Sequence, residues 1–278
     1  MGNPLGRFRE ITPGCAIGGP LPAGWRPLPD LDLLVLCGLT GVGKTTTMAL
    51  VRPLLGRVVD LPERRLLVDQ VVAGLYRADP ATLDRIERFA LTARFRADHP
   101  GGVAEILSQL TVPQDLAAAP LIFDGLRGAD EIRYAARALP HARFAALLAT
   151  DFMRLNRLLR RADAFDRAVT SAESGVRRAL PPGLDTLFTR PEIEELERRV
   201  ASGTLSEAEL AAKLAIVREE RLNYDPDCMM AAFAEIDPAR WLAIDTVRHE
   251  PPAVAAQIAD FLRTSPRPAP GRADACRH

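Results

Sequence analysis

The sequence predicts an α/β fold with a mainly parallel sheet and helices on both of its faces. Short apolar runs alternate along the chain with longer segments of helical periodicity, which is the pattern of strands joined by crossover helices. The first apolar run, 33–37, is followed at once by a glycine-rich loop and a helical segment. We therefore expect five strands, at 33–37, 57–60, 120–124, 144–149 and 241–245.

The first of these runs reads Leu-Leu-Val-Leu-Cys, as expected of a strand buried on both faces. Helical patterns lie between and after the strands, at 44–55, 63–77, 81–97, 102–110, 129–138, 151–161 and 252–263. Residues 162–235 contain no strand-like run but hold helical patterns at 191–201 and 206–221, the second opened by Ser206 and Glu209 as a capping box. We expect a helical insertion there, before the last strand.

The two ends of the chain are rich in Gly and Pro and show little periodicity. We expect a flexible lead-in over 1–30, one domain over 31–264, and a flexible tail over 265–278.

Composition excludes several classes of protein. The 36 basic and 36 acidic residues balance, so net charge does not indicate a nucleic-acid or membrane-surface binder. No apolar stretch reaches the roughly 18 residues of a transmembrane helix, and the N-terminus lacks the order of a signal peptide. The four cysteines have no metal or redox spacing. The expected location is the cytoplasm.

The segment Gly38-Leu39-Thr40-Gly41-Val42-Gly43-Lys44-Thr45 is built to hold phosphates. Its glycines let successive amides turn toward an anion at a helix N-terminus, where Lys44 would reach the β- and γ-phosphates and Thr45 would ligate magnesium. A glycine-rich turn without a ligand is the alternative, and the strand before and helix after the segment disfavour it. The predicted nucleotide-binding residues are Gly38, Thr40, Gly41, Val42, Gly43, Lys44, Thr45 and Thr46.

A second group follows the third predicted strand. Asp124 ends an apolar run, which places its carboxylate at the carboxyl edge of the sheet, where it can hold magnesium. Gly125 lets the chain turn closely, and Arg127 can grip a substrate phosphate. Asp124 could instead only cap the helix near 129, but the nearby glycine-rich loop favours the functional interpretation.

Two further groups are catalytic candidates. Arg154, Arg157 and Arg161 share one helical face and could neutralise a transferring phosphoryl group. A solvated arginine face explains them equally well. Asp60 ends the second strand and could accept a proton from an acceptor hydroxyl, with Arg64 and Arg65 binding an anionic acceptor. The alternative is a helix opened by Pro62 without further function.

These pieces, in this order, resemble the P-loop kinases that phosphorylate small molecules, the adenylate kinase and dephospho-CoA kinase group, over about residues 32–263. The turn from Asp124 to Arg127 is similar to that group's Asp-Gly turn, and Arg154, Arg157 and Arg161 are similar to the arginines that open its lid. The resemblance implies a three-layer α/β/α P-loop NTPase core, ATP with magnesium, and a closing lid. Residues 60–115 and 162–235 match no known segment of the group, so the acceptor is not named.

Two functions follow as hypotheses. The first is a kinase that transfers a phosphoryl group from ATP to a small-molecule or nucleotide-like acceptor. The second is an ATPase or nucleotide-dependent switch that acts on a macromolecule, with the insertion at 162–235 as its partner surface. The chain shows no clustered basic tract for nucleic acid, and it contains no guanine-specifying Asn-Lys-x-Asp run.

Overall fold

The structure is a computed structural model that describes residues 7–83, 85–161 and 184–264. Its centre is a five-stranded sheet in which every pairing is parallel, with the strand order β5-β7-β4-β8-β9. The prediction of an α/β fold with a five-stranded parallel sheet is confirmed, and each strand lies where the sequence places one. The strands are β4 (Leu33–Cys37), β5 (Val59–Asp60), β7 (Leu121–Leu126), β8 (Ala142–Leu148) and β9 (Trp241–Asp245).

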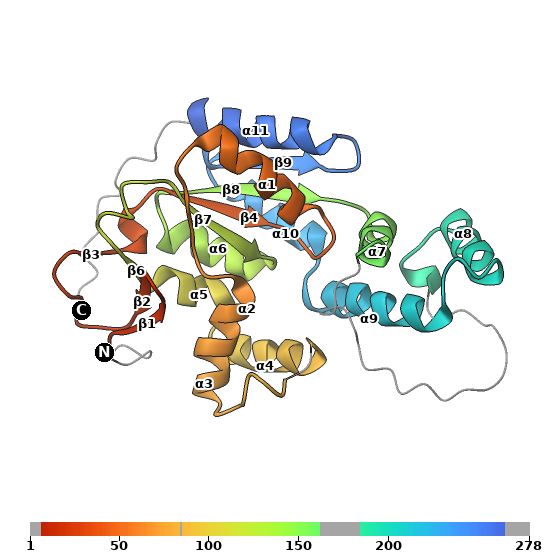
Figure 1. Ribbon diagram of the computed structural model, residues 1–278, viewed down its shortest axis with the longest axis horizontal. Coiled ribbons are helices and arrows are strands. Elements are labelled where there is room, and N and C mark those ends of the chain that lie inside the picture. The colour runs from red at the N-terminus through yellow and green to blue at the C-terminus, as the bar shows by residue number, and fades with distance from the viewer. Residues whose placement is uncertain (1–6, 84, 162–183, 265–278) are drawn as a thin grey trace.

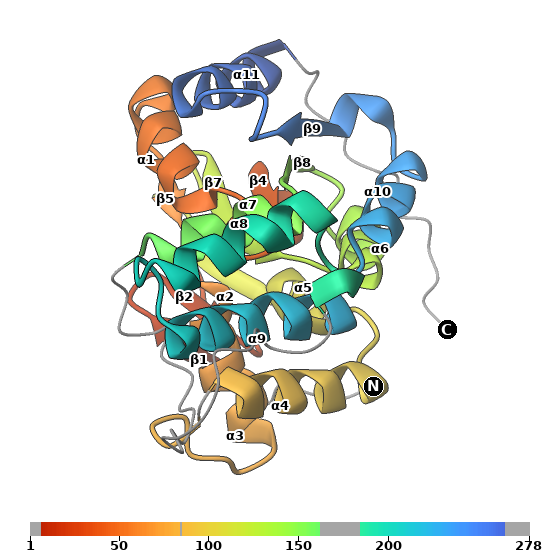
Figure 2. The same ribbon diagram turned by 90° about the vertical axis from the view of Figure 1, so that its right-hand side faces the viewer.

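The central strand β4 is buried on both faces because helices cover both sides of the sheet. Leu33 and Val35 pack into one apolar core, and Leu34 and Leu36 pack into the other. This alternation follows from the period of two of a strand. One face is covered by α1 (Lys44–Leu55) and α11 (Pro251–Thr264), and the other by α5 (Gly102–Ser108), α6 (Ala129–Ala138) and α10 (Pro226–Ala234) (Figures 1 and 2).

The strand order changes direction at β4. From β4 the chain forms β5 and β7 on one side of that strand, and it then crosses to form β8 on the other side. Loops that leave neighbouring strands in opposite directions diverge, and this is where α/β sheets bind ligands. The segment after β4, the end of β7 and the start of α7 (Asp151–Leu159) therefore meet at one place.

A second, antiparallel sheet packs beside the first and was not predicted. It has the order β1-β2-β6-β3 and joins β1 (Arg9–Thr12), β2 (Cys15–Ile17) and β3 (Trp25–Pro27) to β6 (Leu110–Pro113). A short helix, η1 (Leu28–Asp30), follows β3. The expectation of a flexible lead-in is wrong for residues 7–30, whereas 1–6 and the expected tail 265–278 lie outside the described residues.

After β5 and before α5, the chain runs through a series of helical segments. These are α2 (Arg64–Leu67), the π-helical turn η2 (Val68–Val72), α3 (Ala73–Leu75) and α4 (Arg85–Asp98). The first three follow one another without a break over the segment where one helix was predicted, 63–77. The fourth corresponds to the predicted helix at 81–97.

The part of the expected insertion that the structure describes, 184–235, is helical. It contains η4 (Leu184–Thr186), α8 (Arg190–Ala201), α9 (Glu207–Asn223) and α10, and η5 (Pro238–Arg240) then leads into β9. Ser206 caps α9 and accepts a hydrogen bond from the Glu209 amide at 3.1 Å, which is one half of the predicted capping box. Helices α7, α8 and α9 share their own small apolar core and lie beyond the carboxyl ends of β4 and β8 (Figures 1 and 2).

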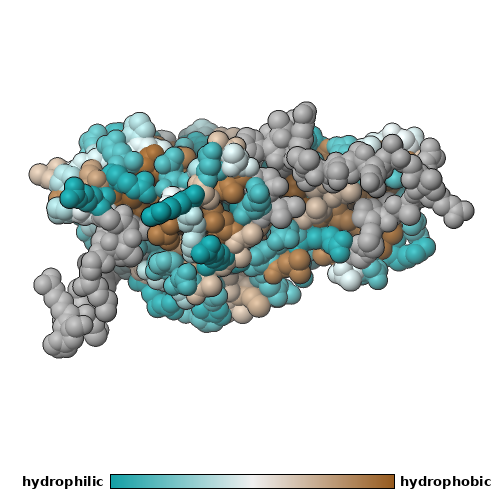
Figure 3. Space-filling view, turned by 90° about the horizontal axis from the view of Figure 1, so that it is seen from below, coloured by the Kyte–Doolittle hydropathy of each residue, from teal (hydrophilic) through white to brown (hydrophobic). Residues whose placement is uncertain are grey.

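Among the described residues, the large exposed apolar side chains are scattered along the chain. Within the described ranges, no helix combines the length and apolar character needed to cross a bilayer. Seen from below, hydrophilic and hydrophobic residues are interspersed (Figure 3). The large apolar side chains that are exposed come from separate segments: Leu21, Leu54, Leu75, Leu222 and Val247.

Candidate functional site

The glycine-rich loop, Gly38–Thr45, joins β4 to α1 and requires glycine for two reasons. Gly38 and Gly41 have φ angles of 137° and 87°, which side chains with a Cβ rarely adopt. A Cβ on Gly38 would lie 2.6 Å from the carbonyl oxygen of Leu147, and one on Gly41 would lie 2.8 Å from that of Arg154. The loop is therefore packed closely against β8 and α7.

The loop also presents backbone N–H groups that lack protein acceptors. Because α1 begins at Lys44, the amides of its first turn have no partner inside the helix. Among the residues that the structure describes, the amides of Gly41, Gly43, Lys44 and Thr45 donate to no acceptor. Successive free amides at a helix N-terminus form an arrangement that binds anions.

Lys44 lies folded over its own loop. Its Nζ donates to the carbonyl oxygens of Gly38 at 2.8 Å and Leu39 at 3.2 Å, and it lies 3.8 Å from Oδ1 of Asp124. Burial lowers the pKa of Lys44 below its ordinary value, although Asp124 partly opposes this shift. Arg127 lowers the pKa further because it is a second positive charge nearby.

Asp124 supplies a carboxylate oxygen that suits a divalent cation. Its Oδ1 is buried and accepts no hydrogen bond from any residue in the described part of the chain. Thr45, the residue after Lys44, has an exposed side chain on the first turn of α1. The described residues contain no cluster of three or more metal-ligating side chains. This donor set fits Mg²⁺, which keeps several waters and is held by one or two carboxylates together with substrate phosphates.

Arg127 is brought to the same place by β7 and the turn that follows it. Its Nη1 donates to Oε1 of Glu220 at 2.7 Å, while its buried Nε has no hydrogen-bond partner in the described residues. Its own amide donates to Oε2 of Glu131 at 3.0 Å, which fixes the turn after Asp124. Glu220 therefore fixes one end of the guanidinium group, whereas Nε is a buried donor without a described partner.

The arginines of α7 hold the loop from outside. Arg154 is 1% exposed, and its Nε donates to the Thr40 carbonyl at 2.9 Å. Arg157 donates to the carbonyls of Gly41 at 3.2 Å and Thr246 at 2.7 Å, and to Oγ1 of Thr246 at 2.9 Å. A solvated arginine face is therefore wrong for these two residues. Their guanidinium groups bond to backbone carbonyls and stabilise the shape of the loop.

Burial lowers the pKa of Arg157; Asp245 partly opposes this shift, and the positive charge of Arg161 adds to it. Arg161 is the first residue after α7 and its turn, and its amide donates to the carbonyl of Leu158. It is near enough to Arg157 to repel it, but none of its described contacts reaches the loop.

Sequence reasoning missed Glu220, which is the most connected carboxylate of the site. It lies on α9, is completely buried, and accepts from the Thr40 amide at 2.9 Å and from the Thr40 hydroxyl. It also accepts from Arg127 and from Nη2 of Arg154. A sequence signal existed: helical spacing places Glu220 on the same face as the buried Leu210 and Val217.

The predicted acceptor side is arranged differently. Asp60 is exposed on edge strand β5 and accepts hydrogen bonds at 3.0 and 3.2 Å from Arg52 of α1, not from a residue of the loop. Arg64 is buried and donates at 2.8 and 2.7 Å to the two oxygens of Glu131, and at 2.8 Å to the Tyr224 hydroxyl. Arg64 therefore forms a buried ion pair inside the protein, contrary to the expectation that it binds an acceptor.

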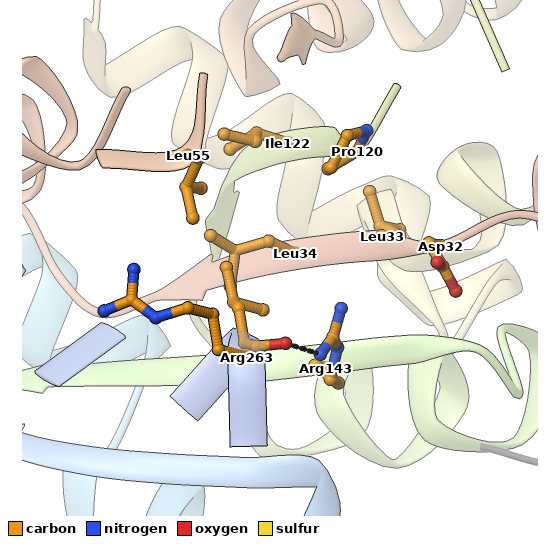
Figure 4. A pocket seen from close by; sticks show the side chains of 9 residues that line it. Asp32, Leu33, Leu34, Leu55, Pro120, Ile122, Arg143 and Arg263 are labelled. Atoms are coloured by element: carbon orange, nitrogen blue, oxygen red, sulfur yellow. Dashed lines mark hydrogen bonds between the residues drawn. The ribbon is translucent and has the colours of Figure 1, made fainter. Parts of the chain in front are cut away.

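A cavity of about 430 Å³ lies at the amino-terminal ends of β4 and β7 (Figure 4), whereas the loop leaves the carboxyl end of β4. Leu34, Ile122 and Leu55 form apolar walls, and Arg143 donates to the carbonyl oxygen of Leu262 at 2.6 Å. Because Leu34 and Ile122 belong to the amino-terminal halves of their strands, this cavity is not part of the site around the loop.

The structure thus gathers Lys44, Asp124, Arg127, Arg154 and Arg157 at the glycine-rich loop. Comparison of the chain with protein-family models and with curated proteins finds no match. The proposals that follow therefore rest on the residues of the site.

Proposed function

We propose that this protein is a P-loop kinase that transfers the γ-phosphoryl group of ATP to a small-molecule or nucleotide-like acceptor, with Mg²⁺. One observation carries the proposal. The free amides of the glycine-rich loop, Lys44 and the buried, unbonded Oδ1 of Asp124 lie together at the carboxyl end of β4. Phosphates, a bridging lysine and a metal-ligating carboxylate are what phosphoryl transfer needs at one place.

Lys44 supports nucleotide binding because its present partners are replaceable. Two loop carbonyls and Asp124 compensate its charge only in part, so that burial still lowers its pKa. A triphosphate placed on the loop amides would bring negative oxygens to Nζ. The bound anion would therefore relieve the unfavourable burial of the ammonium group.

Asp124 and Thr45 would hold the magnesium ion. When bound, the metal supplies positive charge that neutralises the charge developing on the phosphate oxygens. The chain's own contribution is to present a carboxylate oxygen at Asp124 and a hydroxyl at Thr45, and to leave the remaining ligand positions to water and phosphate.

Arg127 favours a transferase over a switch. Its partner-free Nε is a buried donor at the phosphate end of the site, the place of a group that stabilises a transferring phosphoryl. A module that only binds nucleotide has no need of this donor. The alternative, an ATPase acting on a macromolecule, is supported by the position of α7, α8 and α9 beside the loop (Figure 1).

The test begins with binding. Wild-type protein should bind ADP in isothermal titration, and Lys44→Ala should weaken that binding at least about tenfold, the loss expected of one charge-assisted phosphate contact. Arg190→Ala is the matched control, because Arg190 is an exposed cation that pairs with Glu194 on α8. Equal binding by wild type and Lys44→Ala would contradict a phosphate site at the loop.

The second step identifies the reaction. Wild-type protein is incubated with Mg²⁺-ATP and a panel of nucleosides, nucleotides and coenzyme precursors, and ADP formation is measured. A kinase produces ADP at a rate that rises sharply with one acceptor. Hydrolysis that no acceptor changes, but that a protein or nucleic acid stimulates, would favour the ATPase instead.

A further inference from the structure

Glu220 joins the helical insertion to the glycine-rich loop through both of its oxygens. Oε1 accepts from the Thr40 hydroxyl and from Arg127 at 2.7 Å, and Oε2 accepts from the Thr40 amide at 2.9 Å and from Arg154. A buried carboxylate destabilises the folded protein strongly unless it is paired and hydrogen-bonded. The position therefore demands these donors.

We propose that Glu220 is a positioning residue for phosphoryl transfer, which holds the guanidinium groups of Arg127 and Arg154 against the loop. This inference rests on the proposed kinase function and deepens it. It makes α9 a part of the active site, whereas the ATPase hypothesis treats the insertion as a surface for a partner.

Several contacts anchor the end of α9 that carries Glu220. The amide of Tyr224 donates to the Glu220 carbonyl at 2.8 Å, and the Tyr224 hydroxyl accepts from the buried Arg64. Arg96 of α4 lies over the Tyr224 ring at 4.8 Å and donates to the Asn223 carbonyl at 3.1 Å. The end of α9 is thus tied to two other helices, so the carboxylate is held before any ligand arrives.

Charge explains why a positioning group is needed. Lys44, Arg127 and Arg154 are cations that converge on one loop, with Asp124 and Glu220 as the facing carboxylates. Without Glu220, mutual repulsion would drive Arg127 away from the phosphate end of the loop. With it, Nη1 is fixed and the free Nε keeps its direction.

The contacts of Glu220 do not overlap the free amides of the loop. Of the loop amides, Glu220 accepts from that of Thr40, whereas the amides of Gly41, Gly43, Lys44 and Thr45 donate to no acceptor in the described part of the chain. Loss of the carboxylate should therefore affect the transfer step much more than the binding of ADP. This separation distinguishes a positioning role from a general loss of folding.

The experiment compares Glu220→Gln with Glu219→Gln. Glu219 is the neighbouring residue of α9, and its side chain accepts from the amide group of Asn223 at 2.9 Å. We expect Glu220→Gln to lower kcat at least about tenfold while the Kd of ADP changes less than about threefold, because the charge that orients the arginines is lost. Glu219→Gln should match wild type in both quantities.

A double-mutant cycle tests whether Glu220 acts through Arg127. In an Arg127→Ala background, Glu220→Gln should lower kcat by less than about threefold, since the group that it orients is gone. If the two substitutions lower kcat independently, or if Glu220→Gln alone leaves kcat unchanged, the proposal is wrong.

A binding measurement separates this inference from the proposed function. Wild-type protein should bind ADP with aluminium fluoride, a mimic of the transferring phosphoryl group, more tightly than ADP alone, and Glu220→Gln should lose that gain. If aluminium fluoride tightens the binding of ADP but no acceptor is phosphorylated, the kinase proposal is wrong, whereas the role of Glu220 still holds. Absence of the gain in wild type, or its retention in Glu220→Gln, overturns the inference.

If Glu220→Gln does not fold, hydrogen exchange of the wild-type protein replaces it. Aluminium fluoride added to the ADP complex should slow exchange at 217–223 of α9 together with 38–45 of the loop, because the carboxylate couples the two segments. Protection confined to the loop would overturn the proposal.

Discussion

Nζ of Lys44 and Oδ1 of Asp124 lie 3.8 Å apart, although Lys44 begins helix α1 and Asp124 lies on strand β7. The contact arises because β4 and β7 are parallel neighbours, so the loop that follows one strand faces the end of the other. The charge of neither side chain is fully compensated. Lys44 donates to carbonyl oxygens of its own loop, and Oδ1 of Asp124 accepts no hydrogen bond from a described residue. Both are therefore groups that the proposed nucleotide and its metal would contact.

Replacing the carboxylate tests its role with metal. Asp124→Asn should raise the Mg²⁺ concentration for half-maximal activity about tenfold or more, because an amide oxygen is a weaker ligand for a hard cation. Binding of ADP without Mg²⁺ should be unchanged or tighter, since a negative charge near the phosphates is removed. An unchanged Mg²⁺ requirement would argue against a metal ligand at this position.

The loop glycine nearest α7 should not tolerate a side chain. Gly41→Ala places a Cβ 2.8 Å from the Arg154 carbonyl at a φ of 87°, so the loop must shift. We expect loss of ADP binding and a free energy of unfolding lower by about 1–3 kcal/mol. Gly74→Ala is the control, because no atom lies within 4 Å of a Cβ at that helical position. Calorimetry and urea unfolding measure both quantities.

The ion pair between Arg64 and Glu131 should contribute strongly to the free energy of unfolding. Both side chains are buried, and Nη2 of Arg64 lies 2.7 Å from Oε1 of Glu131. Glu131→Gln removes one charge and should lower the free energy of unfolding by about 3–5 kcal/mol, because Arg64 stays buried without compensation. Arg133→Ala, which breaks an exposed pair with Glu235, should have little effect. Urea unfolding of both variants measures these changes, and equal free energies of unfolding for Glu131→Gln and wild type would show that the pair does not stabilise the fold.

The same pair predicts a pH dependence. Burial raises the pKa of Glu131, but attraction to Arg64 and hydrogen bonds from Arg64 and two backbone amides lower it more, to a net value below the ordinary 4.5. The contribution to stability is therefore complete above pH 4.5, and it is lost as the pH falls through the folded-state pKa. The difference in stability between wild type and Glu131→Gln should shrink on acidification. A difference that stays constant down to pH 2 would show that Glu131 does not titrate as stated.

Local patterns were sufficient for the parallel sheet. The apolar run of β4 and the four other strand positions could be predicted because burial on both faces requires continuous apolar residues. The antiparallel sheet could not. Its strand β2 is only three residues long, and its partner β6 lies far along the chain. The Pro13-Gly14 turn between β1 and β2 is a local hairpin signal, but it does not reveal the pairing with β6.

The residues of the site divide in the same way. The places of the glycine-rich loop and of Asp124 were predictable, since each is set by a strand next to it in the sequence. Their role in nucleotide and metal binding stays a prediction. Arg64 was assigned to an acceptor, but the structure buries it against Glu131. Arg154 and Arg157 reach the loop as expected, yet they bond to its carbonyls. Which partner an arginine finds depends on packing that brings distant segments together.

The sequence by itself determined the strands of the parallel sheet and the glycine-rich loop at the carboxyl end of β4, because each depends on neighbours along the chain. Only the tertiary structure decided that α9 delivers Glu220 to Thr40, Arg127 and Arg154. That contact depends on where a helix far along the chain packs. Burial then favours the contact, because the carboxylate of Glu220 is removed from water and needs hydrogen-bond donors from the protein.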